Sequence, residues 1–175
     1  KFLPLRANQV SNEHERHALV KVIDRLMYRL QGEMKDYVPQ LLSFIGKMLI
    51  DNDPVARAEA REIVSNLAKL SGLPIILKSL RPDFDSEDAG TRAIVAQTLA
   101  TVAYSLGISE IIPFLIVTSR SKSWKVKQIG IRIINNIAFL AGNGILPFLG
   151  DMVPIVQSSL GDQTPAVVKS AIKCI

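Results

Sequence analysis

Apolar residues recur along the chain at a helical spacing, and the pattern itself repeats. Four segments carry a basic residue near the start of a helical pattern, at spacings of 41, 35 and 35 residues: Arg16, Arg57, Arg92 and Lys127. A fifth segment follows 41 residues later, with Val168 in the basic position. Offsets +3, +6, +7, +10, +11 and +14 from these residues trace one face of a helix. Of these 27 positions, 24 are apolar, whereas the composition alone would give about 13.

Turn and capping residues divide the chain at the same period. Gly72, Gly107 and Gly142 follow the apolar stripes, where a helix end favours a residue that can take positive φ. Asp53 and Thr164 each precede a proline, which is typical of a capped helix start. Each repeat is therefore predicted to be a short helix, a loop and a longer helix. We expect the long helices near 12–31, 54–71, 87–106, 124–141 and 165–175.

This organisation predicts an all-α fold without strands. A period of 35 to 41 residues favours HEAT-type helical pairs, stacked into a right-handed superhelix of about four to five repeats. Residues 1–175 would form a single block of such repeats. Because a helical pair buries its apolar face only against neighbouring pairs, we expect the array to continue beyond both ends.

The positive charge of the chain is concentrated in its last third. The formal net charge is +5, yet residues 1–110 balance, and no carboxylate lies between Glu110 and Asp151. A polyanionic partner is one explanation. The most apolar stretch, Ile129–Leu149, is interrupted by Arg132 and three asparagines, so we interpret the chain as soluble. A single cysteine is typical of a reducing compartment.

Residue patterns for catalysis or metal binding are weak. His14 and His17 lack a third ligand, so two solvated side chains at a helix start are the favoured reading. Cys174 falls on the apolar stripe, as a buried thiol would. The acidic run from Asp83 to Asp88 departs from a calcium loop and is better explained as a helix cap. We therefore predict no enzymatic activity, no cofactor and no metal.

The basic residues have two interpretations, which the residues alone leave open. In the first, Arg16, Arg57, Arg92 and Lys127 form a structural ladder, bonding to acidic residues or loop carbonyls of the neighbouring pair. In the second, basic groups on the long helices bind an RNA backbone, since offset +5 becomes positive at Arg132 and Lys173, with Gln128 beside Arg132. The candidate RNA-binding residues are Arg92, Arg120, Lys122, Lys125, Lys127, Arg132, Lys169 and Lys173. Trp124, at a helix start, is expected to pack rather than stack on a base.

Several stretches together resemble one known family. They are Leu19–Arg25, Ala56–Lys69, Arg81–Asp85, Ser105–Ile108, Ile112–Leu115, Ser123–Trp124 and Ile145–Pro147. In order and content they resemble the largest subunit of splicing factor 3b, a HEAT-repeat scaffold of the spliceosome. The sequence departs from that family at Ala166–Val168 and before Ser123, and Gln128 stands where a histidine is usual.

The resemblance implies a nuclear, non-enzymatic scaffold within the small nuclear ribonucleoprotein that recognises the intron branch site. Its implied partners are other splicing factor 3b subunits and spliceosomal proteins, including a remodelling helicase, together with intron RNA and small nuclear RNA. Neither a membrane nor a small-molecule substrate is implied. The alternative is a HEAT scaffold that binds only proteins, as a transport receptor or phosphatase scaffold does. An enzyme is a second alternative, but no nucleophile lies with a base.

Overall fold

The computed structural model describes residues 13–175, apart from the side chains of residues 13–16, 30–32 and 34. Within that range every regular element is helical and none is a strand, so the predicted all-α fold is confirmed. The chain divides into two compact units, one ending at Ser79 and the other spanning Leu80–Ile175. Each unit is described separately.

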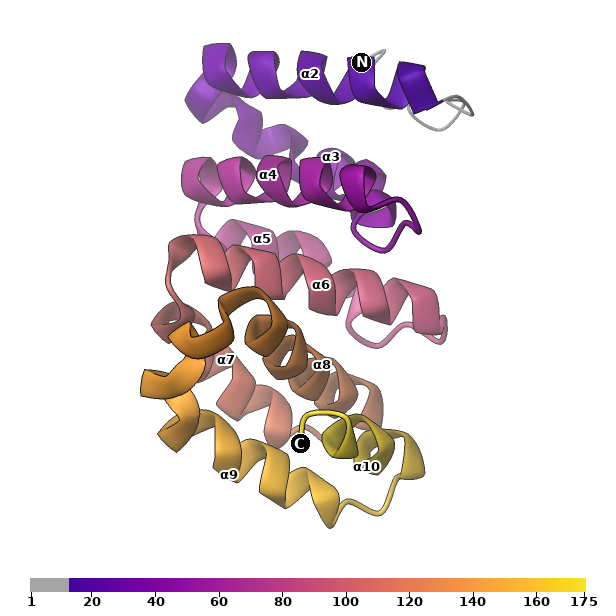
Figure 1. The fold of residues 1–175 in the computed structure, drawn as a ribbon, viewed down its shortest axis with the longest axis vertical. Coiled ribbons are helices and arrows are strands. Elements are labelled where there is room, and N and C mark those ends of the chain that lie inside the picture. The colour runs from indigo at the N-terminus through magenta and orange to yellow at the C-terminus, as the bar shows by residue number, and fades with distance from the viewer. Residues whose placement is uncertain (1–12) are drawn as a thin grey trace. The chain divides into compact units, whose positions relative to one another are not determined.

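The first unit alternates long and short helices. It contains α2 (Glu13–Leu30), the 3-10 segment η1 (Gln31–Tyr37), α3 (Val38–Met48), α4 (Pro54–Ser71) and most of α5 (Leu73–Leu80). The long helices α2 and α4 pack against each other, and α3 packs against α4 (Figure 1). The core consists of apolar side chains from these helices, including Ile23, Met27, Ile45, Ile63 and Leu67.

Local sequence explains where α4 begins and ends. The Asp53 carboxylate accepts hydrogen bonds from the backbone N–H groups of Val55 and Ala56, at 3.0 and 3.1 Å. Pro54 occupies the first turn, where its missing N–H costs nothing. The helix ends at Gly72, whose φ of 79° is the left-handed conformation that glycine adopts readily.

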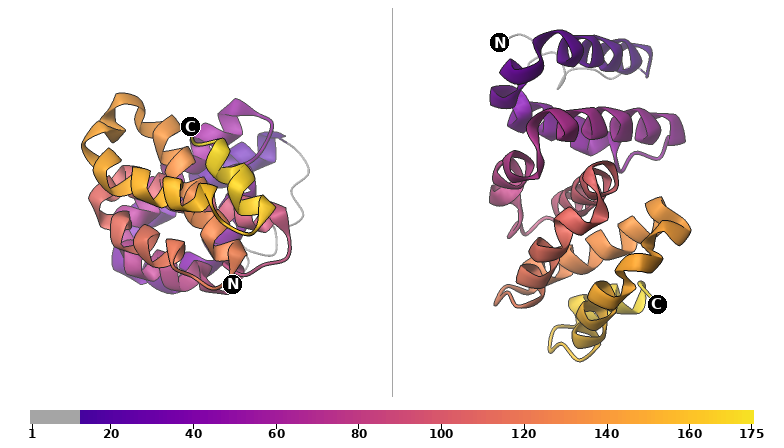
Figure 2. Two further views of the ribbon diagram at one scale, coloured as in Figure 1. Left: turned by 90° about the horizontal axis from the view of Figure 1, so that it is seen from below. Right: turned by 90° about the vertical axis from the view of Figure 1, so that its left-hand side faces the viewer.

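The second unit has two layers of helices. It contains η2 (Arg81–Asp83), α6 (Ala89–Leu106), α7 (Ile108–Ser119), α8 (Trp124–Ala141), η3 (Gly142–Phe148), α9 (Leu149–Leu160) and α10 (Pro165–Ile172). One layer consists of α6, α8 and α10, the helices at the periodic basic positions, and in it α8 packs between α6 and α10. Helices α7 and α9 pack against each other and against α8, and so form the other layer (Figure 2).

The predicted apolar stripe faces the core of each unit. In α4 the stripe residues at offsets +3, +6, +7, +10 and +11 are all buried, and so are the residues at the same offsets in α6. Two apparent exceptions to the stripe, Thr98 and Gly130, are buried as well. A Cβ added to Gly130 would lie 2.3 Å from Oγ1 of Thr118 on α7, so glycine here permits a close approach of two helices. Val22 on α2 departs from the pattern, because it is 46% exposed.

The apolar C-terminal half does not form one continuous helix. By length and composition alone, Trp124–Leu160 could cross a membrane. In the structure this stretch is divided among α8, η3 and α9. Helix α8 buries Ile129, Ile133 and Ile137 within the second unit. These three isoleucines are thus used in packing between helices, whereas Phe139 near the end of α8 is exposed.

Candidate nucleic-acid interface

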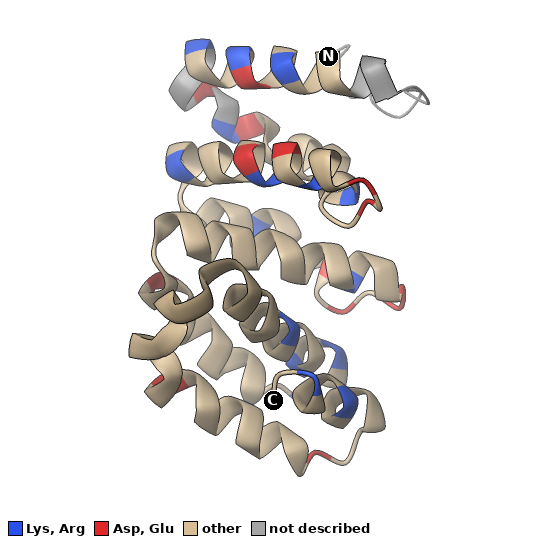
Figure 3. Cartoon of the chain, viewed as in Figure 1, with Lys and Arg blue, Asp and Glu red and all other residues tan. Residues whose placement is uncertain are grey.

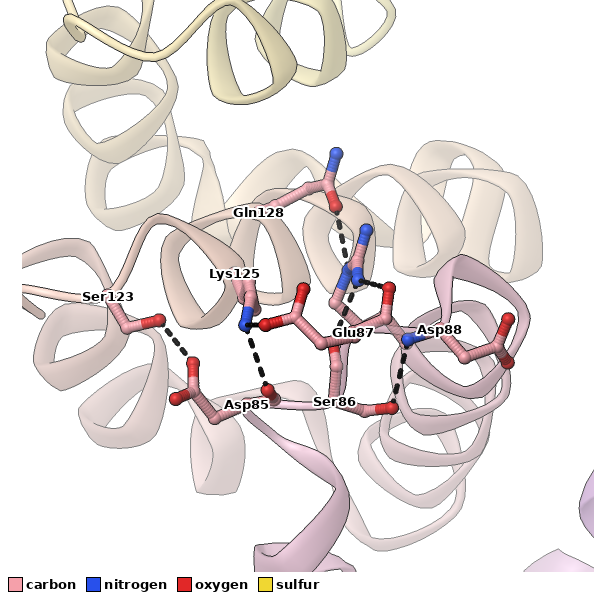
Figure 4. A network of polar contacts seen from close by, with 8 residues as sticks. Asp85, Ser86, Glu87, Asp88, Ser123, Lys125 and Gln128 are labelled. Atoms are coloured by element: carbon pink, nitrogen blue, oxygen red, sulfur yellow. Dashed lines mark hydrogen bonds and ion pairs between the residues drawn. The ribbon is translucent and has the colours of Figure 1, made fainter.

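Arg92 lies inside a polar network at the start of α6. Its side chain is only 5% exposed. Its Nη1 donates to the backbone carbonyls of Ser86 and Glu87, at 2.8 and 2.9 Å, and its Nε donates to Oε1 of Gln128 at 3.1 Å (Figure 4). The guanidinium also stacks 5.1 Å from the ring centroid of Trp124. Arg92 therefore joins the loop before α6 to the first turns of α8.

Gln128 continues this network toward α10. Its side chain is 5% exposed. While Oε1 accepts from Arg92, Nε2 donates to the carbonyl of Ala166 at 3.2 Å and lies 3.3 Å from Oγ of Ser170. A single amide thus connects three neighbouring helices, α6, α8 and α10. Because buried polar groups need partners, this arrangement satisfies both ends of the amide.

The acidic loop before α6 is tied to the start of α8. Lys125 Nζ pairs with Glu87 Oε1 at 2.5 Å and donates to the carbonyl of Asp85 at 3.2 Å. The hydroxyl of Ser123 donates to the Asp85 carboxylate at 2.5 Å (Figure 4). Asp88 accepts from the backbone N–H and the hydroxyl of Thr91. These hydrogen bonds hold the pKa of Asp88 below its usual 3.8.

Other residues at the periodic basic positions also bond to loops. Lys127 Nζ pairs with Asp162 Oδ2 at 2.7 Å, in the loop before α10. In the first unit, Arg57 Nη1 donates to the carbonyls of Asp51 and Asn52, at 2.7 and 2.8 Å. The side chain of Arg16 lies outside the described residues. Arg57 and Arg92 each donate to carbonyls of the loop that precedes their own helix, and Arg92 donates as well to Gln128 of the neighbouring pair.

The candidate basic residues differ in their exposure to solvent. Arg92 and Gln128 are buried, so neither side chain is presented to a phosphate backbone. Lys125 and Lys127 are both ion-paired with carboxylates of the chain, and only 12% and 28% of their side chains are exposed. Neither is therefore free to bind a phosphate. Arg120 and Lys122, in the loop before α8, are exposed, as are Lys169 on α10 and Lys173 just after it. Lysines and arginines of the C-terminal helices are visible in Figure 3.

Arg132 differs from the other buried or half-buried cations. It is half-buried on α8, and its one recorded bond, to the carbonyl of Ala89, is at the 3.5 Å limit. Among the described residues no carboxylate pairs with it. Partial burial is the main cause that lowers the pKa of Arg132, and the charge of the nearby Arg92 is the second. Arg132 is therefore a partly desolvated cation close to a second guanidinium.

Trp124 and Cys174 pack against one small apolar cluster. The cluster consists of Ile131, Val167 and Ala171, which are almost fully buried. Cys174 is partly buried, lies 3.4 Å from the carbonyl of Ile131 through Sγ, and is a free thiol. Desolvation raises its pKa to about 11. Trp124 is engaged by this cluster and by Arg92.

The described histidine has a local partner. Nδ1 of His17 on α2 forms an ion pair with Glu59 on α4 when the imidazole is protonated. The side chain of His14 lies outside the described residues. Among the side chains that the structure describes, no three His, Cys, Asp or Glu residues are grouped as metal ligands.

The described residues define an all-α protein of successive long and short helices, in whose second unit buried Arg92 and Gln128 join α6, α8 and α10. No family model matches the chain. Over 167 residues it is 42% identical to the "U2 snRNP component prp10" of Schizosaccharomyces pombe. This alignment covers 95% of the present chain and 14% of the S. pombe protein. Over 163 residues it is 36% identical to the "U2 snRNP component HSH155" of Saccharomyces cerevisiae, covering 93% and 17% respectively.

The chain thus spans less than one fifth of the length of these curated relatives. Both relatives are named as components of the U2 small nuclear ribonucleoprotein. The resemblance found in the sequence is therefore confirmed by these matches, and the chain is similar to one short segment of each relative.

Proposed function

We propose that this chain is a segment of a HEAT-repeat superhelix that serves as a non-enzymatic scaffold in precursor-messenger RNA splicing, in the nucleus. The observation that carries the proposal is the 42% identity to a U2 snRNP component over 95% of the chain. The scaffold would hold intron RNA near the branch site together with other spliceosomal proteins, a remodelling helicase among them. Stacked long helices joined by buried bonds suit such a role, because they present a continuous surface.

The proposed RNA contact is the basic face of α8 and α10, defined here as Arg132, Lys169 and Lys173. Arg132 is a partly desolvated cation near Arg92 without a carboxylate partner in the described chain. A phosphate placed beside it would offset the cost of the desolvation and the repulsion from Arg92 by its attraction to the guanidinium. Lys169 and Lys173 are exposed and lie four residues apart. Such groups bind backbone phosphates and carry no base-reading code.

The test is the binding of a fluorescent pyrimidine-rich single-stranded RNA to the full chain across a series of salt concentrations. We compare the unsubstituted chain with the triple variant Arg132→Gln, Lys169→Gln and Lys173→Gln. Each phosphate contact contributes about 0.7 to the logarithmic salt slope for single strands. The triple variant is therefore expected to lower that slope by about 2. Lys47→Gln, an exposed cation on α3, removes the same kind of charge as a control.

The two outcomes separate RNA scaffolding from protein scaffolding. A slope that falls in the triple variant and is unchanged in Lys47→Gln supports an intron contact on the basic face. Binding that is absent, or independent of salt, contradicts the RNA contact. Lys125 and Lys127 are excluded from the variant, because neutralising them would leave Glu87 and Asp162 without their cations.

A further inference from the structure

Two aromatic side chains on neighbouring long helices are exposed at equivalent positions. Tyr104 on α6 lies 12 residues after Arg92, and Phe139 on α8 lies 12 residues after Lys127. Tyr104 is 55% exposed and Phe139 is 80% exposed. Helices α6 and α8 pack against each other, so the two positions lie on adjacent elements (Figure 1). The two rings thus occupy the same register position on two helices that pack against each other.

One of the two aromatic positions, Phe139, shares a helix face with Arg132, the basic group proposed to contact RNA, and Tyr104 occupies the equivalent position of α6. Phe139 follows Arg132 by seven residues, and Tyr104 follows Gln97 by seven. Seven residues are two helical turns, so the members of each pair lie on one side of their helix, about 10 Å apart along its axis. The core stripe occupies the opposite side, as the burial of Ile133, Ile134 and Ile137 indicates. Phe139 is thus outside the packed interior of the unit.

The charge of this region favours a polyanion over a protein. No carboxylate occurs between Glu110 and Asp151, a range that contains the whole of α8. Arg132 on the same face has no carboxylate partner among the described side chains. A flexible single strand combines the two features that such a face requires, a phosphate backbone and flat bases that stack on aromatic rings.

We propose that Phe139 and Tyr104 form an aromatic platform on which bases of single-stranded RNA stack, while Arg132 contacts the backbone beside them. This inference rests on the proposed RNA-binding function and adds to it the groups that hold the bases. Stacking is tolerant of sequence, because every base has a flat face. The platform would therefore hold a strand in place without selecting its sequence.

The test compares two ligands on one set of variants of the full chain. One ligand is a uridine oligomer, and the other is an abasic oligomer of equal length, which has phosphates but no bases. Phe139→Ala is expected to weaken binding of the uridine oligomer by about 5- to 150-fold. It should leave the abasic oligomer and the salt slope unchanged. Tyr104→Ala is expected to act in the same direction, whereas Tyr104→Phe and Phe139→Trp, which keep a ring, should bind as the unsubstituted chain does.

Controls separate this inference from the proposed function. Val117→Ala truncates another exposed apolar residue, 68% exposed on α7, and should not change binding of either oligomer. Circular dichroism checks that Phe139→Ala keeps its helical content, as expected for so exposed a side chain. If Arg132→Gln lowers the salt slope while Phe139→Ala binds uridine oligomers normally, the platform is refuted and the basic face stands. If the unsubstituted chain binds neither oligomer, both proposals fail.

Discussion

Gly130 provides a quantitative test of how closely α7 and α8 pack. A Cβ at this position would lie 2.3 Å from Oγ1 and 3.1 Å from Cβ of Thr118. Because real Cβ contacts essentially never fall below 3.0 Å, Gly130→Ala requires a displacement of at least about 0.7 Å. Thr118 is 2% exposed and its hydroxyl donates to the carbonyl of Leu115 at 2.8 Å. Either that bond breaks or the helices separate.

The expected cost follows from three opposing contributions. Overpacking of a filled core costs about 1–3 kcal/mol, and losing the Thr118 hydrogen bond adds about 1 kcal/mol. Alanine in a helix interior recovers about 1 kcal/mol relative to glycine. Gly130→Ala is therefore expected to lower the free energy of unfolding by about 1–3 kcal/mol.

Urea unfolding followed by circular dichroism measures this change, and a second background isolates its cause. In Thr118→Ala, which removes the clashing oxygen, adding Gly130→Ala should be neutral or stabilising by up to about 1 kcal/mol. Gly150→Ala on α9, where an added Cβ meets nothing within 4 Å, is the matched control and should not destabilise. A Gly130→Ala variant as stable as the original chain, or equally destabilised in both backgrounds, would refute the packing argument.

Three further outcomes are expected. Thr98→Val should raise the free energy of unfolding by about 1 kcal/mol, because Oγ1 of Thr98 is buried without a hydrogen-bond partner among the described residues. The urea midpoint should rise accordingly, and a lower midpoint would contradict this. Asp88 has a folded-state pKa below 3.8, so the stability it contributes is present above that pH and lost as the pH falls through the folded value; acid titration of Asp88→Asn should show a flatter loss, and an unchanged curve would count against the cap. Cys174, with a pKa of about 11, should react with iodoacetamide at pH 8 about 100-fold more slowly than a free thiol; an equal rate would show that the thiol is not desolvated.

The bounds of the long helices are accessible from sequence where both ends carry a chemical cue. The expected range 54–71 coincides with α4, which has a capping aspartate, a proline and a terminal glycine. The expected range 87–106 begins two residues early, because Asp88 is the cap and α6 starts at Ala89. The 3-10 segments η1 and η3 were not predicted. Their residues show no helical periodicity, and their conformation depends on packing against the long helices.

The roles of the basic residues were less accessible. A basic residue at a helix start looks the same in sequence whether it turns toward a loop carbonyl or toward solvent. Arg92 turns inward because Ser86, Glu87 and Gln128 offer acceptors and Trp124 offers a ring. The pairing of Lys125 with Glu87 joins residues 38 positions apart. The repeat period of about 35 residues is the one sequence feature that could have suggested it, since it brings successive loops together.

The amide of Gln128 gives the layer of long helices a direction. An amide has one accepting end and one donating end, and here the accepting end meets α6 while the donating end meets α10. Structural repeats are often treated as interchangeable units. Because the amide can rotate but has only one accepting oxygen, a module exchanged at α8 keeps both bonds only if its neighbours offer a donor on one side and an acceptor on the other. The contacts of Gln128 therefore restrict which helices can lie beside α8, and grafting this segment between other helices requires a donor at one seam and an acceptor at the other as well as matching shape.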